Sequence, residues 1–446
     1  MASFVVSDAQ SVSFTLSDFE SGIITGTGSI VSATSFSPGV TITGDAAKLI
    51  VEGDILRQMS AVAGAGTISG ATVSPIGLTL AVGEDAALRT LSGDAVSLAV
   101  AASLSLTNEG AIGGGNTLFT SGGTQDGDAV YASGISGSVA EIVNGGVLSG
   151  IGGVELVNFK TVSILNDGTI RGSSNVAIEV TTIRSDATFG LVNAGLVTAA
   201  VAGRAISVTG AAATIENHGM IIGSVVLSSG NDRYLGAAGV LSGTVFGGVG
   251  NDLLVGGWSE EKFYGGIGND SIRGGGGSDE IVGVNGDDVL RGGGDADVLR
   301  GDAGNDVLRG DGDDDMLQGG DGNDDLFGGA DDDLIQGDAG SDDLTGGAGA
   351  DAFYFRVATD STLAASDTIL DFQRGTDLID ISNVTTGTAD FNGTDGFFEG
   401  ADEAQVTYSR SGNNVIVRVD RNGGGTEDMR FLVLGVTELS AADFML

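Results

Sequence analysis

An apolar residue returns at every ninth position between Gly247 and Tyr354. These 108 residues divide into twelve nonapeptides without an insertion, and the eighth place is always Leu, Ile or Phe. Nine residues are too few for a helical repeat, and glycine at this density would cost a helix about 1 kcal/mol per site. The pattern therefore predicts a glycine-rich turn followed by a short strand in each nonapeptide. Two nonapeptides would complete one coil of a parallel stack, with the eighth place pointing inward.

The sixth place of every nonapeptide is acidic. The segment holds 23 Asp and 3 Glu against 5 Lys and Arg, which gives it a formal charge of −21. One apolar side chain per nonapeptide contributes about 2 kcal/mol, whereas ordering the backbone costs about 1–2 kcal/mol per residue. Bound multivalent cations must therefore supply the remaining stability. Ca²⁺ fits best because turns offer carboxylate and carbonyl oxygens, and one ion between each pair of neighbouring turns would come to roughly ten ions.

These nonapeptides resemble the hemolysin-type RTX repeat GGxGxDxUx, whose family fold is a right-handed parallel β-roll with Ca²⁺ between successive turns. The resemblance implies that the sixth-place aspartates are side-chain ligands and that glycine carbonyls complete each shell. An offset unit at 228–236 adds one further aspartate. The implied carboxylate ligands are Asp232, Asp252, Asp270, Asp279, Asp288, Asp297, Asp306, Asp315, Asp324, Asp333, Asp342 and Asp351. The implied carbonyl ligands are those of Gly248, Gly250, Gly266, Gly268, Gly275, Gly277, Gly304, Gly320, Gly322 and Gly340.

Two departures from the repeat carry expectations of their own. The unit GGWSEEKFY at 256–264 differs at places four to seven and has Glu261 at its acidic place. The resemblance therefore does not imply a calcium ion at this unit. Asp295, Asp313 and Asp331 replace the usual fourth-place glycine. We expect them to strain their turns, because only glycine takes a positive φ without penalty.

A different pattern follows Tyr354, where glycine becomes scarcer. The stretch DTILDFQRGTDLIDIS at 367–382 resembles the C-terminal module of serralysin-like type I secretion substrates, and the final LSAADFML resembles the end of that module. The matching residues are Asp367, Ile369, Asp371, Phe372, Gly375, Asp377, Ile379, Asp380 and Ile381. This resemblance implies export by a type I secretion apparatus to the outside of a Gram-negative bacterium. The loop DRNGGGTED at 420–428 resembles a cation loop through Asp420, Asn422 and Asp428, but a plain hairpin turn is favoured.

A looser repeat, Asn-x-Gly-x-apolar-x-small, recurs in the first half at Asn108, Asn144, Asn166, Asn193 and Asn217. Asparagine tolerates a left-handed turn and can hydrogen-bond its stacked equivalent, which favours a parallel β-helix of roughly 22 to 27 residues per coil. An Ala/Gly/Val-rich β-sandwich is the alternative. The predicted fold class is all-β, with a right-handed parallel β-helix (1–226) continuing into a calcium-binding β-roll (227–354) and then a small β-rich secretion module (355–446).

The charge of −41 over 446 residues argues against nucleic acid and anionic membranes as partners. No stretch approaches the roughly 18 unbroken apolar residues of a membrane span. The first residues lack a basic segment before an apolar block, so we do not expect the general export route. The partners that remain are cations and the secretion apparatus, with a surface polysaccharide or a second copy of the chain as open alternatives.

No catalytic residue is assigned. The single histidine, His218, lies in a turn motif, no HExxH is present, and Glu141, Glu155 and Asp186 are scattered along the chain. We therefore expect a non-enzymatic, secreted calcium-binding protein with a structural, adhesive or matrix role. Two alternatives stay open. One is a β-helix enzyme that modifies polysaccharides, as a lyase, epimerase or hydrolase, and the other is a self-assembling surface-layer or fibre protein.

Overall fold

The computed structural model describes strand backbone within residues 3–113 and, with gaps at 135–136, 174–175, 200–202, 237, 386–388, 395 and 398–402, all of residues 128–446. Side chains are described at 105–109, at 112 and from 128 onward. The chain divides into two compact units, Met1–Phe246 and Gly247–Leu446. Every helix or strand of the described residues is a β-strand except the 3-10 helix η1 (Ala441–Asp443). No described helix is long and apolar enough to cross a membrane.

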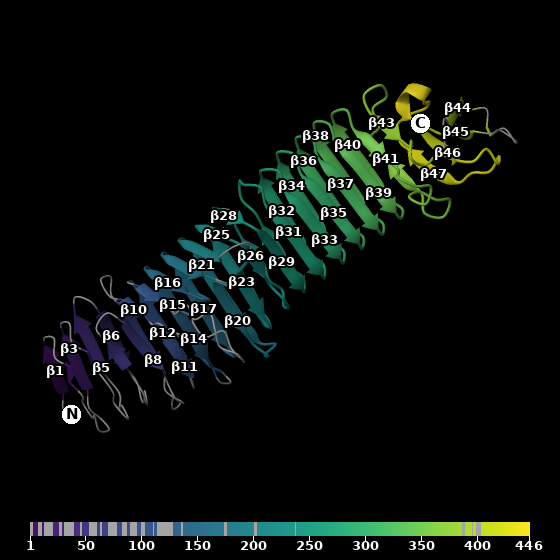
Figure 1. Ribbon diagram of the computed structural model, residues 1–446. Coiled ribbons are helices and arrows are strands. Elements are labelled where there is room, and N and C mark those ends of the chain that lie inside the picture. Colours follow the sequence, from purple (N-terminus) through teal and green to yellow (C-terminus); the bar gives the residue numbers. More distant parts are fainter. Residues whose placement is uncertain are drawn as a thin grey trace. The chain divides into compact units, whose positions relative to one another are not determined.

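The first unit stacks its strands in three columns, drawn from purple to teal in Figure 1. One column contains β1 (Ser3–Ser7), β3 (Ser21–Thr25), β5 (Val40–Gly44), β6 (Ala47–Glu52), β9 (Leu78–Val82), β12 (Ser103–Asn108), β15 (Val139–Asn144), β18 (Thr161–Asn166), β21 (Ala187–Asn193), β24 (Ala211–Asn217) and β27 (Arg233–Leu235). A second contains β10 (Ala87–Arg89), β13 (Ala111–Gly113), β16 (Val147–Gly150), β19 (Thr169–Gly172), β22 (Leu196–Ala199), β25 (Met220–Ile222) and β28 (Val240–Ser242). The third contains β7 (Ser60–Val62), β8 (Ala65–Ser69), β11 (Val96–Ala99), β14 (Val130–Ser133), β17 (Val154–Val157), β20 (Ile178–Thr181), β23 (Arg204–Thr209), β26 (Ser224–Val226) and β29 (Thr244–Val249), while β2 (Ser11–Val12) pairs separately with β4 (Ser29–Ile30).

The asparagine motif sets the register of this β-helix. Its five asparagines stand opposite one another in successive strands of the first column, from Asn108 to Asn217. Each Nδ2 donates to the next Oδ1 at 2.7–2.8 Å, and all five side chains are fully buried. The predicted ladder of stacked asparagines is confirmed from Asn108 to Asn217. The predicted coil length of 22 to 27 residues is confirmed from Asn144 onward.

Three strand pairs near the chain start depart from a uniform parallel helix. β5 with β6, β6 with β9, and β7 with β8 are antiparallel. Only two residues separate β5 from β6 and two separate β7 from β8. A parallel crossover needs about a dozen residues, so such short connections reverse the chain direction.

The second unit is a narrower roll with two strand columns, drawn in teal and green in Figure 1. One column contains β30 (Leu253–Val255), β32 (Ser271–Gly276), β34 (Val289–Gly294), β36 (Val307–Gly312), β38 (Asp325–Ala330) and β40 (Asp343–Ala348). The other contains β31 (Lys262–Ile267), β33 (Glu280–Asn285), β35 (Val298–Ala303), β37 (Met316–Asp321), β39 (Leu334–Ala339) and β41 (Ala352–Tyr354). Neighbours in a column are 18 residues apart, and every eighth-place side chain is at most 2% exposed, as the nonapeptide pattern predicts.

Both columns continue into the C-terminal segment. β42 (Asp367–Ile369) pairs with β40, and β43 (Leu378–Asp380) pairs with β41. Beyond them β47 (Met429–Val433) pairs with β42, and β48 (Phe444–Met445) pairs with β43. β44 (Ala389–Gly393) pairs with β45 (Ala404–Ser411), which forms an antiparallel meander with β46 (Asn414–Asp420) and β47. The loop after Asp420 joins the antiparallel strands β46 and β47, so it is a hairpin turn, as the sequence interpretation favoured. The carboxylate of Asp420 accepts hydrogen bonds from backbone N–H groups of that loop.

Candidate metal centres along the roll

Each sixth-place aspartate lies in the turn just before a strand and contacts its equivalent in the next coil. The backbone N–H of Asp252 donates to Oδ1 of Asp270 at 2.7 Å, and the same bond recurs at intervals of 18 residues on both sides of the roll. These aspartates are at most 3% exposed. The turns therefore hold two ladders of buried carboxylates.

The second oxygen of these carboxylates has a different environment. Oδ2 is buried and has no hydrogen-bond partner in Asp270, Asp279, Asp288, Asp297, Asp306, Asp315, Asp324, Asp333, Asp342 and Asp351. Loss of hydration on burial raises the pKa of each carboxyl, for example to about 6 at Asp270 and to about 7 at Asp279. A buried carboxylate oxygen without a partner costs several kcal/mol unless a cation compensates it.

First-place glycines keep the space beside Oδ2 open. A Cβ atom on Gly319 would lie 2.3 Å from Oδ2 of Asp324 and 2.7 Å from the carbonyl oxygen of Gly337 in the next coil. The equivalent carboxylate and carbonyl oxygens of other coils lie beside Gly265, Gly301, Gly310 and Gly328. A carboxylate oxygen from one coil and a carbonyl oxygen from the next thus converge on a space that any side chain would fill.

Carbonyls at the second and fourth places are also directed along the stack. A Cβ on Gly266 would meet the carbonyl oxygen of Gly248 at 2.1 Å, and one on Gly268 would meet that of Gly250 at 2.1 Å. All four glycines have positive φ. The turns therefore present rows of backbone oxygens to their neighbours, and these glycines are among those that the sequence marks as carbonyl ligands.

This donor set fits Ca²⁺. Oxygen atoms alone, with few carboxylates per site, suit a hard cation that takes six to eight oxygens. Among the described residues no three His, Cys, Asp or Glu side chains gather in a group that could hold a metal ion, so backbone carbonyls would have to supply most of each shell.

In the divergent nonapeptide at 256–264, the acidic side chain is hydrogen-bonded within its own turn. Oε2 of Glu261 accepts a hydrogen bond from the backbone N–H of Gly257 at 3.0 Å, and Oε1 accepts one from the hydroxyl of Ser259 at 2.7 Å. Both oxygens are satisfied within the unit, in contrast to the aspartates at the equivalent places. Asp232, in the first unit, is 1% exposed, and its Oδ1 accepts from the backbone N–H of Ala213 at 2.6 Å.

Two further carboxylates join the ladders, and the sequence interpretation assigned them no role as ligands. Oδ1 of Asp367 accepts from the N–H of Asp342 at 3.1 Å, and Oδ1 of Asp377 accepts from the N–H of Asp351 at 3.3 Å. Oδ2 of Asp367 is buried without a partner, whereas Oδ2 of Asp377 accepts from the N–H of Gln373. Both aspartates begin an Asp-x-Ile triplet, which has the same residue types as places six to eight of a nonapeptide. This triplet could have revealed them, although the nine-residue spacing has ended there.

The expected backbone strain is present. Asp295, Asp313 and Asp331 have φ of 68°, 69° and 75°. The second place shows the same feature, which the sequence interpretation did not include. There Val284 has φ of 90°, and Asp302, Asp311 and Asp338 have φ of 68–81°. A β-branched residue at positive φ is a true outlier, because its Cβ collides with the backbone.

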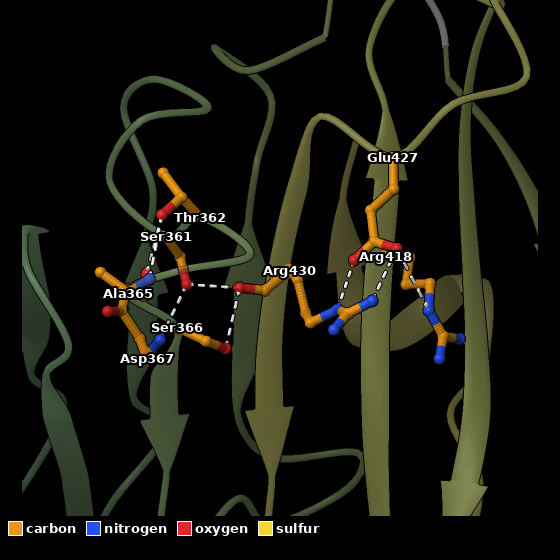
Figure 2. Close-up of polar contacts among 8 residues, drawn as sticks. All are labelled: Ser361, Thr362, Ala365, Ser366, Asp367, Arg418, Glu427 and Arg430. Atoms are coloured by element: carbon orange, nitrogen blue, oxygen red, sulfur yellow. Dashed lines mark hydrogen bonds and ion pairs between the residues drawn. The ribbon is translucent and has the colours of Figure 1, made fainter.

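The segment before β42 is fixed to β47 by a polar network (Figure 2). The hydroxyls of Ser361 and Ser366 both donate to the backbone carbonyl of Arg430. The hydroxyl of Ser361 also accepts from the N–H of Asp367 at 2.8 Å. On the other side of β47, Glu427 forms ion pairs with Arg418 and Arg430. These contacts hold Asp367 at the end of its ladder.

Among the described residues of the first unit, the structure brings Glu155 and Glu179 together. Glu155 on β17 stands directly opposite Glu179 on β20, and Tyr131 on β14 stands opposite Glu155. Burial, followed by the charge of Glu155, raises the pKa of Glu179. Glu141 lies in a different column, on β15. Asp186 forms ion pairs with Arg184 and Lys160.

His218 lies in the turn after the asparagine ladder. Its side chain is 52% exposed, and Nε2 is 3.9 Å from a carboxylate oxygen of Glu216. This exposed position between β24 and β25 confirms its interpretation as a turn residue.

The C-terminal part of the chain is similar to known proteins. The family model described as Peptidase M10 serralysin C terminal matches residues 228–446. Metallopeptidase AprA of Pseudomonas marginalis is 36% identical over 93 residues, which are 21% of this chain and 19% of that protein. The chain therefore aligns with about a fifth of this relative's length.

Two solved structures are also similar in part. The AlgE6R2 subunit of the Azotobacter vinelandii mannuronan C5-epimerase is 27% identical, over 37% of this chain and 91% of that one, with a TM-score of 0.24. The AlgE6R3 subunit of the same enzyme is 24% identical, over 44% of this chain and 80% of that one, with a TM-score of 0.19. TM-scores this low support no conclusion about this chain.

Proposed function

We propose that this is a secreted calcium-binding protein whose roll folds on Ca²⁺ outside the cell. The match of residues 228–446 to the family model described as Peptidase M10 serralysin C terminal supports the proposal. The ligands would be the sixth-place aspartates together with glycine carbonyls of adjacent turns, and Asp367 joins them. About ten ions would occupy the two ladders, one between neighbouring turns on each side.

The proposal depends on one observation, the buried Oδ2 atoms without partners in successive coils. Bound Ca²⁺ would supply positive charge and the missing coordination to these oxygens. The other parts of each site come from the chain itself. First-place glycines keep the space beside Oδ2 open, Oδ1 atoms accept hydrogen bonds from neighbouring turns, and the eighth-place side chains fill the interior.

Calcium linkage gives the export mechanism. At low cytosolic calcium the charge of −21 in residues 247–354 favours an extended chain that a type I secretion apparatus can thread. Extracellular Ca²⁺ binds the folded state alone and so stabilises it by mass action. Sites of extracellular modules typically have Kd values of about 10⁻⁴ to 10⁻³ M, which is suited to this switch.

The test is calcium titration of the full chain, followed by circular dichroism and isothermal titration calorimetry. We expect strand content to rise cooperatively with Ca²⁺, saturation near ten ions per chain, and reversal by a chelator. Equal strand content with and without the chelator would contradict the proposal. The β-helix of the first unit serves in this scheme as a stiff structural or adhesive element.

A second candidate function has one observation in its favour. Glu155 and Glu179 stand on adjacent strands with Tyr131 on the strand before them, and burial raises the pKa of Glu179. Two carboxylates about 5 Å apart, one with a raised pKa, are the basis of retaining glycoside hydrolysis. A turnover screen on polysaccharides tests it: activity that Glu179→Gln abolishes and Glu141→Gln preserves would establish an enzyme.

A further inference from the structure

The outward face of β32, β34 and β36 carries a column of arginines in an otherwise acidic roll. Arg273, Arg291 and Arg309 occupy the ninth places of three coils and stand directly opposite one another. They are three of the five basic residues in a segment with 26 acidic ones. All three are exposed, and they lie about 4.8 Å apart from rung to rung.

The acids of the roll do not neutralise this column. Of the three arginines, only Arg291 forms an ion pair with an acid of the described residues, namely Asp311. The guanidinium of Arg309 instead lies over the ring of Phe327, 4.0 Å from its centroid. The opposite face differs, because Arg300 pairs with Asp302 at 3.0 Å and Lys262 pairs with Glu280 at 2.6 Å. Two guanidinium groups thus remain available to a ligand on one face only.

Small or apolar residues flank the middle of the column, while exposed Ser271 and Asp325 stand at its two ends. Val289 and Val307 flank it at the seventh places, with Val289 48% exposed. Gly275 and Gly293 flank it at the second places of the first two coils, and Asp311 occupies that place in the third coil, where it pairs with Arg291. Guanidinium groups bind carboxylates through two parallel hydrogen bonds, and the apolar C–H faces of sugar rings pack on aliphatic and aromatic side chains.

We propose that an acidic polysaccharide, a linear chain of uronic acid units, binds along Arg273, Arg291, Arg309 and Phe327 on the face of β32, β34, β36 and β38. This inference rests on the proposed function, because the column exists only when the roll is folded with Ca²⁺. The strip is one residue wide, which matches a single linear chain, whereas the two phosphate backbones of duplex nucleic acid would extend over the acidic surface on either side.

The test uses the full chain at a fixed free calcium concentration and a short oligogalacturonate as the probe, followed by isothermal titration calorimetry. The double variant Arg273→Gln/Arg309→Gln removes the two arginines that lack carboxylate partners. The matched control, Lys262→Gln/Arg300→Gln, removes the same charge from the opposite face. The fully methyl-esterified oligomer tests the need for carboxylates, and phosphatidylglycerol vesicles test a lipid surface.

We expect the wild type to bind the oligogalacturonate, the double variant to bind at least about tenfold more weakly, and the control to stay within about twofold. We expect no binding of the ester and weaker binding of the vesicles. Equal losses in both variants, equal binding of the ester, tighter binding of the vesicles, or no binding by the wild type would each overturn the inference. The calcium-dependent strand transition separates the two proposals: if it is absent the proposed function fails, whereas if it is present without oligogalacturonate binding only this inference fails.

Discussion

Oδ1 of Asp367 accepts a hydrogen bond from the backbone N–H of Asp342 at 3.1 Å, although 25 residues separate them. Every earlier bond of this ladder within the roll spans 18 residues. The C-terminal segment therefore continues the carboxylate ladder across a longer connection. Burial, followed by the charge of Asp342, raises the pKa of Asp367 to about 9.

Asp367→Asn should remove about one bound calcium ion per chain. The amide keeps the hydrogen bond from Asp342 but lacks the charge that an ion at this place requires. Calorimetric stoichiometry checks the result, with Asp325→Asn as the control, because Asp325 is an exposed seventh-place residue in the same column. An unchanged stoichiometry in Asp367→Asn would mean that the ladder ends at Asp342.

The effect of pH should change sign with calcium. Burial raises the folded-state pKa of Asp279 from 3.8 to about 7, and the other ladder aspartates behave alike. The folded state without calcium then binds more protons than the unfolded state, so its stability falls as pH rises from about 4 to about 7. With saturating calcium, protons compete with the ion, and stability should fall on acidification instead.

Circular dichroism in chelator and urea unfolding in saturating calcium, each at pH 5 and pH 8, measure the two trends. In chelator the strand content of the roll should be higher at pH 5. In calcium the urea midpoint should be higher at pH 8. The same direction in both conditions would show that the buried carboxylates do not bind the ion.

Val284→Gly should stabilise the calcium-loaded roll by about 1 kcal/mol. Val284 has φ of 90°, where a β-branched side chain costs about 1–3 kcal/mol and glycine fits freely, although glycine loses some entropy on folding. The urea midpoint in saturating calcium measures the gain. Val289→Gly is the control: it lies within a strand without positive φ, and the same change there should destabilise by about 0.5–1 kcal/mol.

Asn166→Ala should destabilise the first unit by about 2–4 kcal/mol, regardless of calcium. The substitution removes the acceptor for Asn144 Nδ2 and the donor to Asn193 Oδ1, so one buried N–H and one buried oxygen lose this ladder partner. Thermal unfolding in chelator isolates this effect from the roll. The exposed neighbour Asp167 provides the control, since Asp167→Ala should change stability by less than about 0.5 kcal/mol.

The C-terminal matches illustrate the limits of reading the sequence alone. Asp367 and Asp377 stood out as parts of a family pattern, yet their place in the ladders depends on connections of 25 and 26 residues that return the chain to the stack. Glu155 and Glu179 meet for a similar reason, because a whole coil lies between them. Linear spacing does not reveal such contacts when coil lengths vary.

The sequence by itself determined which side chains face the interior and which lie in the turns, because both follow from the repeat period. Nine-residue spacing sends every eighth-place side chain inward and every sixth-place carboxylate into a turn, and repeated asparagines stack because equivalent turns superimpose. Only the tertiary structure decided which polar atoms stay unsatisfied. Oδ2 of Asp270 lacks a partner while both oxygens of Glu261 have one, and Arg309 packs on Phe327 rather than on an acid. These outcomes depend on distances between neighbouring coils, and a one-dimensional pattern does not contain those distances.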